Sequence, residues 1–142
     1  MEPFVKHHIE DNCGIIEFGN PSGNSLTSNM LNGLYQNLTS LDSNKQVKVI
    51  LLKSAGLKAF SGGASFTELR TLKSFNEARG FFMGFANLIN AIRILKKFVI
   101  IQIQGKVVGG GIGIVAACDY TIAHEKAEIK LSELSIGLGP FV

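Results

Sequence analysis

The stretch Gln104–Asp119, QGKVVGGGIGIVAACD, places three consecutive glycines, Gly109–Gly111, shortly after the apolar run at 98–103. A glycine inside a helix or strand costs about 0.5–1 kcal/mol relative to alanine. Three in a row therefore need a reason. Either the backbone packs unusually close to another element, or its N–H groups face a ligand. The second arrangement is available wherever a helix begins, because helix N-termini carry free N–H groups and the positive end of the dipole.

A second stretch upstream has the same organisation. Ala59–Leu69, AFSGGASFTEL, also runs from a strand through a glycine-bearing loop to the start of a helix. Two backbone N–H donors from two separate helix starts are what an oxyanion hole for a thioester carbonyl requires.

Two other interpretations of the glycines compete with this one. Gly111–Ala116 fits the dinucleotide fingerprint G-x-G-x-x-A, but residues 104–110 separate it from the preceding strand and no acidic residue takes the ribose role. A Walker loop is excluded, because no Gly-Lys-Ser/Thr follows. Tight packing of a helix on a sheet would account for Gly111 and Gly113, and this structural interpretation stays open beside the anion-binding one.

The composition indicates one globular domain. The chain has 142 residues, 46% of them hydrophobic and 18% charged. A domain of this length buries about 68–70% of its unfolded surface. The formal charge of +3 comes from dispersed lysines rather than a basic stripe interleaved with aromatics, so the sequence does not call for nucleic acid.

The two cysteines, Cys13 and Cys118, lie far apart and lack metal-ligand spacing. No signal peptide stands at the N-terminus, so we expect free thiols in a cytoplasmic protein and no metal site. Residues 98–118 are long enough to suggest a membrane span. Gln102, Gln104, Lys106 and the glycines argue against a span and favour a buried strand followed by a buried helix.

Hydrophobic periodicity predicts alternating strands and helices. Strands are expected at Phe4–Glu10, Ile15–Phe18, Val47–Leu52, 98–103, Tyr120–Ala123 and Ile129–Leu131, with a loop over Ser54–Gly63. Helices are expected after an N-cap at Thr27, over Ala64–Leu69, over Asn76–Leu95, and from the glycine run to Cys118. Apolar strands separated by helices indicate a parallel sheet covered on both sides.

Each long helix has one apolar face. In the first helix it comprises Met30, Leu31, Leu34, Leu38 and Leu41, and in the later one Phe82, Phe85, Leu88, Ile89 and Ile92.

The two glycine stretches, followed by LSELSIGLGP at Leu131–Pro140, resemble the crotonase (enoyl-CoA hydratase/isomerase) family over essentially the whole chain. The resemblance implies an α/β crotonase-like (ClpP/crotonase) spiral of repeated ββα units, forming one core domain over residues 1–142. Family members continue into C-terminal helices that cover the acyl pocket and build a trimer. We therefore expect a longer form that assembles as a trimer or hexamer.

The resemblance also assigns site residues. It implies that the backbone N–H groups of Ala64 and Gly110 form the oxyanion hole and that Glu133 is a catalytic acid–base. Coenzyme A would be bound as part of the substrate, with no other cofactor. Its pocket would be lined by two loops, which comprise Asn24, Ser25 and Leu26 in the first, Gly62, Gly63, Ala64, Ser65 and Phe66 in the second, together with Gly109 and Gly110.

Two positions depart from the family pattern. Ser65 stands where an Asp usually follows the first oxyanion residue, and Gly113 stands where hydratases carry their first catalytic Glu. One carboxylate suffices for a double-bond shift, whereas hydration shares its proton transfers between two. The sequence thus predicts an acyl-CoA enzyme, with isomerase favoured over hydratase. The alternative is a non-catalytic scaffold that binds RNA or a partner protein. Glu68 is interpreted as a partner of the helix dipole rather than a catalyst.

Overall fold

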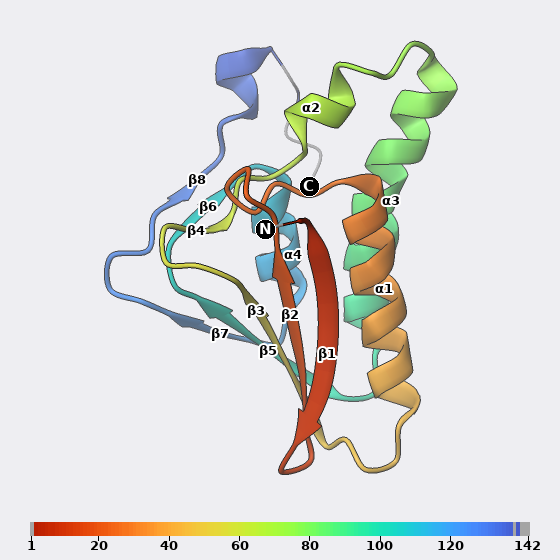
Figure 1. The fold of residues 1–142 in the computed structure, drawn as a ribbon, viewed down its shortest axis with the longest axis vertical. Helices are drawn as coiled ribbons and strands as arrows, with labels where there is room; N and C mark the ends of the chain where they lie inside the picture. Colours follow the sequence, from red (N-terminus) through yellow and green to blue (C-terminus); the bar gives the residue numbers. More distant parts are fainter. Residues whose placement is uncertain (1, 138, 140–142) are drawn as a thin grey trace.

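The computed structural model describes residues 2–137 and residue 139. Figure 1 shows a twisted sheet with two long helices side by side along one face and a smaller sheet beside one end. The strands are β1 (Phe4–Glu10), β2 (Cys13–Gly19), β3 (Val49–Ser54), β4 (Ala59–Ser61), β5 (Phe98–Ile103), β6 (Lys106–Val108), β7 (Tyr120–Ala123) and β8 (Ile129–Lys130). The helices are α1 (Ser28–Ser43), α2 (Phe66–Leu69), α3 (Phe75–Ile94), α4 (Gly110–Ala117) and the 3₁₀ turn η1 (Glu133–Ile136).

The large sheet has the strand order β1-β2-β3-β5-β7. β1 and β2 form an antiparallel hairpin, and β3, β5 and β7 then add in parallel. The hairpin turns at Asp11 and Asn12, both of which adopt positive φ, a conformation that Asp and Asn tolerate better than most residues. The predicted parallel sheet is confirmed for the strands after the hairpin.

A second, three-stranded sheet with the order β4-β6-β8 was missed in the sequence, although β8 lies within the predicted strand Ile129–Leu131. The stretch Ser54–Gly63, predicted as a loop, contains β4, and β6 follows β5 after a two-residue turn. Strands of two or three residues are too short to show a period of two. Each strand of the second sheet follows a strand of the large sheet and precedes a helical segment. This order repeats as β3-β4-α2, β5-β6-α4 and β7-β8-η1, so the predicted ββα units are confirmed.

The hydrophobic core lies between the large sheet and helices α1, α3 and α4. Alternate residues of β3 and β5 point into it, and these are Ile50, Leu52, Val99, Ile101 and Ile103. On α1 the predicted apolar face is confirmed, because all five of its residues are buried. Thr27 is the N-cap, as predicted, and its hydroxyl accepts a hydrogen bond from the N–H of Met30 at 3.2 Å.

Most of the predicted apolar face of helix α3 is confirmed, and Ile89 is partly buried against the core. Phe85, Leu88 and Ile92 are buried as expected, but the buried residue of the second turn is Phe81, whereas Phe82 is 43% exposed. Positions 81, 85, 88 and 92 follow the four-three-four spacing of one helix face. Because Phe81 and Phe82 are adjacent and equally apolar, periodicity did not decide which of them is buried, and packing selected Phe81.

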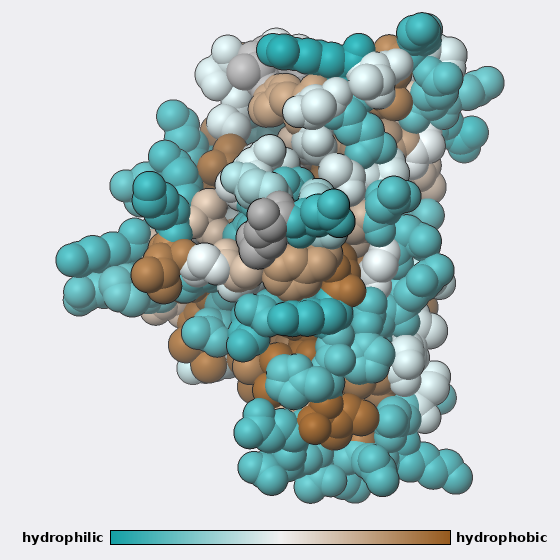
Figure 2. Space-filling model, in the orientation of Figure 1, coloured by the Kyte–Doolittle hydropathy of each residue, from teal (hydrophilic) through white to brown (hydrophobic). Residues whose placement is uncertain are grey.

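The prediction that the large sheet is covered on both sides is wrong for the residues that the structure describes. Among these, no helix covers the face opposite α1 and α3. The strand register aligns Ile15, Leu51, Ile100 and Tyr120 in one row across that face, beside Ile122. Tyr120 is 58% exposed and Ile122 is 52% exposed. Figure 2 shows hydrophobic residues reaching the surface where β5 and β7 run in Figure 1.

We expect the 142-residue chain, produced by itself, to self-associate through this face, because large exposed apolar patches drive association. Tyr120→Lys combined with Ile122→Lys should shift its light-scattering mass toward that of a monomer. Leu57→Lys combined with Ile94→Lys is the matched control, since it adds the same charge at residues that are 87% and 81% exposed elsewhere. A wild-type chain that scatters as a clean monomer would contradict the expectation.

Candidate functional site

The two glycine-bearing turns lie next to each other. β4 and β6 are parallel neighbours, so the turns that follow them meet at the same edge of the small sheet. Gly63 has φ +81°, and a Cβ atom added there would lie 2.8 Å from the carbonyl oxygen of Val108 and 3.5 Å from the amide nitrogen of Gly110. The close approach of two backbones, together with the left-handed conformation, explains the glycine at position 63.

The first turn leaves one amide unused. The Leu26 N–H donates to the Gly63 carbonyl at 2.7 Å, and the Ser65 N–H donates to the Leu26 carbonyl at 2.9 Å. These bonds make a parallel bridge between Leu26 and Ala64. In such a bridge the N–H of the central residue points to the opposite side. The Ala64 N–H therefore faces away from Leu26, and no acceptor bonds to it within the described residues.

The second turn ends at the start of α4. Gly109 precedes the helix with φ 55° and ψ −130° and offers no side-chain cap. The first N–H groups of a helix have no partner within the helix, so the Gly110 N–H is free to bind an acceptor. A Cβ atom at position 110 would lie 2.6 Å from the ring of Phe85 on α3. The glycine thus lets α3 pack directly over the beginning of α4.

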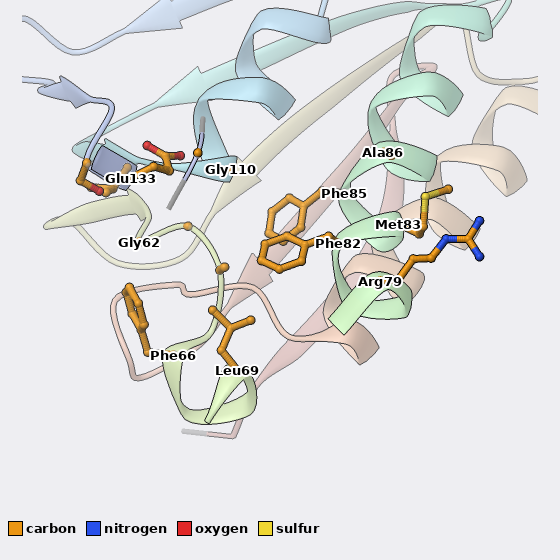
Figure 3. A pocket seen from close by; sticks show the side chains of 16 residues that line it. Gly62, Phe66, Leu69, Arg79, Phe82, Met83, Phe85, Ala86, Gly110 and Glu133 are labelled. Atoms are coloured by element: carbon orange, nitrogen blue, oxygen red, sulfur yellow. The ribbon is translucent and has the colours of Figure 1, made fainter. Parts of the chain in front are cut away.

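A cavity of about 400 Å³ opens beside the two turns (Figure 3). Its walls come from both glycine turns, α2, α3 and η1 and are mostly apolar. In Figure 3 the rings of Phe82 and Phe85 project from α3 toward the side that carries Gly110 and Glu133, while Arg79 extends away from that side. The lining residues are Gly62, Gly63, Ala64, Phe66, Leu69, Arg79, Phe82, Met83, Phe85, Ala86, Val108, Gly109, Gly110, Ser132, Glu133 and Gly139.

Glu133 brings a carboxylate to the second turn. A Cβ atom at Gly109 would lie 3.1 Å from its Oε1 atom. Its Oε2 atom is buried and has no hydrogen-bond partner among the described residues. Burying a polar atom without a partner costs about 1–3 kcal/mol, so such an atom in a native protein calls for an explanation, and a catalytic role is one. The carboxylate is therefore placed to bind or transfer a proton in the cavity.

Some of the residues that the family resemblance assigned to the site line the cavity, and others do not. Gly62, Gly63, Ala64, Phe66, Gly109, Gly110 and Glu133 line the cavity, whereas Asn24, Ser25, Leu26 and Ser65 are not among its lining residues. Leu26 is fully buried. The Asn24 side chain donates to the carbonyls of Ala55 and Ala59, both at 2.8 Å, so it holds the surrounding loops together.

The two residues that depart from the family pattern, Ser65 and Gly113, both lie in helical segments, at the N-cap of α2 and inside α4. Ser65 is the N-cap of α2, and its hydroxyl accepts from the N–H of Glu68 at 3.4 Å. Ser and Asp are both strong N-cap residues, so this substitution preserves the local structure. Gly113 is buried inside α4.

Several lining residues were missed in the sequence. Arg79, Met83 and Ala86 come from α3 and Leu69 from α2. Amphipathic periodicity assigns a helix one inward face, and Phe82 was placed on it. The width of the apolar surface of α3 could have revealed these lining residues. Phe82, Met83 and Ala86 form a second apolar stripe beside the buried face of the helix.

The remaining chemistry-bearing groups lie outside this cavity. Cys13 and Cys118 are free thiols, and burial raises the pKa of Cys118 to about 12, which keeps it protonated. Within residues 2–137 and 139 no cluster of His, Cys, Asp and Glu could hold a metal ion. No helix in that part of the chain is both long and apolar enough to cross a membrane.

Residues 8–142 match the sequence profile of the enoyl-CoA hydratase/isomerase family. The chain belongs to this family, the crotonases. It is 32% identical over 139 residues to the mitochondrial methylglutaconyl-CoA hydratase of Homo sapiens, covering 96% of this chain and 41% of that protein. It is 26% identical over 132 residues to the short-chain-enoyl-CoA hydratase of Clostridium acetobutylicum, covering 92% of this chain and 50% of the other.

The fold agrees with this membership. The crystal structure of an enoyl-CoA hydratase from Bacillus anthracis matches with a TM-score of 0.86 and 27% identity, covering 99% of this chain and 54% of that one. This crotonase chain therefore has the crotonase fold predicted from its sequence, and it spans about half the length of these relatives.

The contact between the two turns is testable by substitution. Gly63→Ala should lower the free energy of unfolding by at least about 1–2 kcal/mol from the left-handed backbone alone, and further because its Cβ meets the Val108 carbonyl. Gly56→Ala is a matched control, since Gly56 has φ +80° and open space around its Cβ position. Denaturant unfolding of both variants separates the cost of the left-handed backbone from the cost of the contact with Val108. If both variants lose the same free energy of unfolding, a Cβ atom at position 63 does not clash with the second turn.

Proposed function

We propose that this crotonase acts on an acyl-CoA thioester, whose carbonyl oxygen is bound by the N–H groups of Ala64 and Gly110. The observation that supports this most directly is the pair of unused amides on adjoining turns, beside an apolar cavity that contains one buried carboxylate. Such donors stabilise the negative charge that develops on the oxygen. Losing one typically costs about 10²–10³ in kcat.

The reaction follows from charge and proton balance. Glu133 removes the proton from the carbon next to the thioester, and the electron pair moves onto the thioester oxygen, where the two amides hold it as an enolate. Returning the proton to the far carbon of the former double bond converts a 3-enoyl thioester to a 2-enoyl thioester. One carboxylate can serve as base and then as acid. The apolar walls suit a hydrocarbon acyl chain and keep water from the enolate.

We therefore propose double-bond isomerisation ahead of hydration. Among the described residues that line the cavity, Glu133 is the single acidic side chain, and Gly113 stands where a hydratase carries its other carboxylate. Coenzyme A enters as part of the substrate. We propose that the protein assembles as a trimer or hexamer.

Replacing Glu133 tests its role in proton transfer. In the full-length protein, Glu133→Gln should keep acyl-CoA affinity, because the amide is nearly isosteric and both N–H donors remain. It should lower kcat by about 10²–10⁴-fold, the scale of lost general acid–base catalysis. Glu125→Gln, at an exposed glutamate outside the cavity, is the control. Wild-type turnover by Glu133→Gln would make that carboxylate structural.

The choice between the two reactions is tested with paired substrates. The full-length protein should shift the double bond of a 3-enoyl-CoA at least about 10²-fold faster than it hydrates a 2-enoyl-CoA, because hydration lacks one acid–base group. Spectrophotometric rates at equal enzyme concentration give the ratio. Fast hydration would mean that another residue positions the water.

The alternative of a non-catalytic binding protein has its own signature. It requires salt-dependent retention of RNA, or capture of a partner protein, with no turnover on a panel of acyl-CoA thioesters. No residue described here favours it over catalysis.

A further inference from the structure

Glu68 joins two helices that are far apart in the sequence. From the four-residue helix α2, its carboxylate accepts hydrogen bonds from the backbone N–H of Ser28, at 2.9 Å, and from the Ser28 hydroxyl. Ser28 is the first residue of α1. Glu68 lies in the first turn of its own helix α2, as the sequence-based interpretation has it, and it also serves the N-terminus of α1.

This link is the last of a series that holds segment 62–68 against segment 23–28. The Gly62 N–H donates to the Gly23 carbonyl at 2.9 Å, and the bridge at Leu26 follows. The Ala64 amide lies inside this bridge, between the bonds that Gly63 and Ser65 make with Leu26. These backbone bonds set its direction, and Glu68 holds the C-terminal side of the bridge through its charged link to α1.

Helix α2 cannot hold its own direction. Nucleating a helical turn is unfavourable, and a single turn forms too few hydrogen bonds to offset that cost. Such a segment therefore depends on tertiary contacts. Its residues Phe66 and Leu69 line the cavity. If Glu68 releases Ser28, α2 loses its attachment to α1 and keeps the backbone bonds near Ala64 and the packing of Leu69 against the core. Both the cavity wall and the Ala64 amide then gain freedom.

We infer that Glu68 is a positioning residue, which aims the Ala64 amide at the substrate oxygen by fastening α2 to the N-terminus of α1. This inference rests on the proposed function, because it presupposes that the Ala64 amide binds an oxyanion. Preorganisation is what makes such a donor effective, and a misplacement of about 1 Å costs about 10²-fold.

Thr27 offers a control that distinguishes a positioning role for Glu68 from a purely structural one. Thr27 is the N-cap of α1, and its hydroxyl accepts a hydrogen bond from the Met30 N–H. Thr27→Ala therefore weakens the same helix terminus without touching α2. Ser28→Ala removes the hydroxyl from the link but leaves the backbone N–H, so its effect should be a fraction of that of Glu68→Ala.

The probe is acetoacetyl-CoA, a thioester that forms an enolate with strong near-ultraviolet absorbance. On binding to the full-length wild-type protein, its enolate absorbance should rise. Glu68→Ala should weaken enolate binding by about 10-fold or more, with a smaller loss of affinity for free coenzyme A, which lacks the carbonyl oxygen that the Ala64 amide binds. Glu68→Gln, which keeps one acceptor oxygen, should recover part of the loss. Thr27→Ala should bind the enolate as wild type does while unfolding at a lower temperature.

Coupling between the partners completes the test. Glu68→Ala combined with Ser28→Ala should bind the enolate no more weakly than Glu68→Ala alone, because both changes break one link. Wild-type enolate binding by Glu68→Ala, or an equal loss in Thr27→Ala, overturns the inference. If Glu68→Ala does not fold, Glu68→Gln with Ser28→Ala takes its place in the same comparison. A wild-type protein that leaves the enolate absorbance unchanged overturns the proposed function itself.

Discussion

The close approach of the two glycine turns is the constraint on which the rest of the site depends. A Cβ atom at Gly63 would meet the Val108 carbonyl at 2.8 Å, and one at Gly111 would meet the side chain of Ser61 at 2.8 Å. A side chain at Gly63 would push the two turns apart, and one at Gly111 would push α4 away from β4. Because the glycines allow the contact, two helix starts lie next to each other and their amides share one cavity.

The strands that carry these turns are too short to be stable alone, and side-chain amides stabilise them. The Ala59 carbonyl, at the start of β4, accepts from Asn24 at 2.8 Å and from Gln104 at 3.1 Å. Gln104 also donates to the hydroxyl of Ser54 at 2.8 Å. These bonds attach the small sheet to the large one. The large sheet supplies the apolar core, and the small sheet places the turns at its edge.

The sequence was sufficient for the elements with strong periodicity. The strands 98–103 and Tyr120–Ala123, the buried face of α1 and the cap at Thr27 were predicted correctly, because a long apolar pattern or a capping side chain is a local signal. The strands β4 and β6 of the small sheet and the burial of Phe81 in place of Phe82 were not. Three-residue strands have no period, and adjacent phenylalanines offer two equally apolar faces, so packing alone decided both.

For the site, the sequence by itself indicated the glycine-bearing turns before two helix starts, and the family resemblance added the carboxylate of Glu133. These are local requirements, since free N–H groups and acidity belong to the residue and its turn. Only the tertiary structure decided which of them meet. It brought Glu133 to Gly109, buried Asn24 in a hydrogen-bond network and turned Glu68 to α1. Those choices depend on parallel pairing between distant strands, which creates contacts that no local pattern encodes.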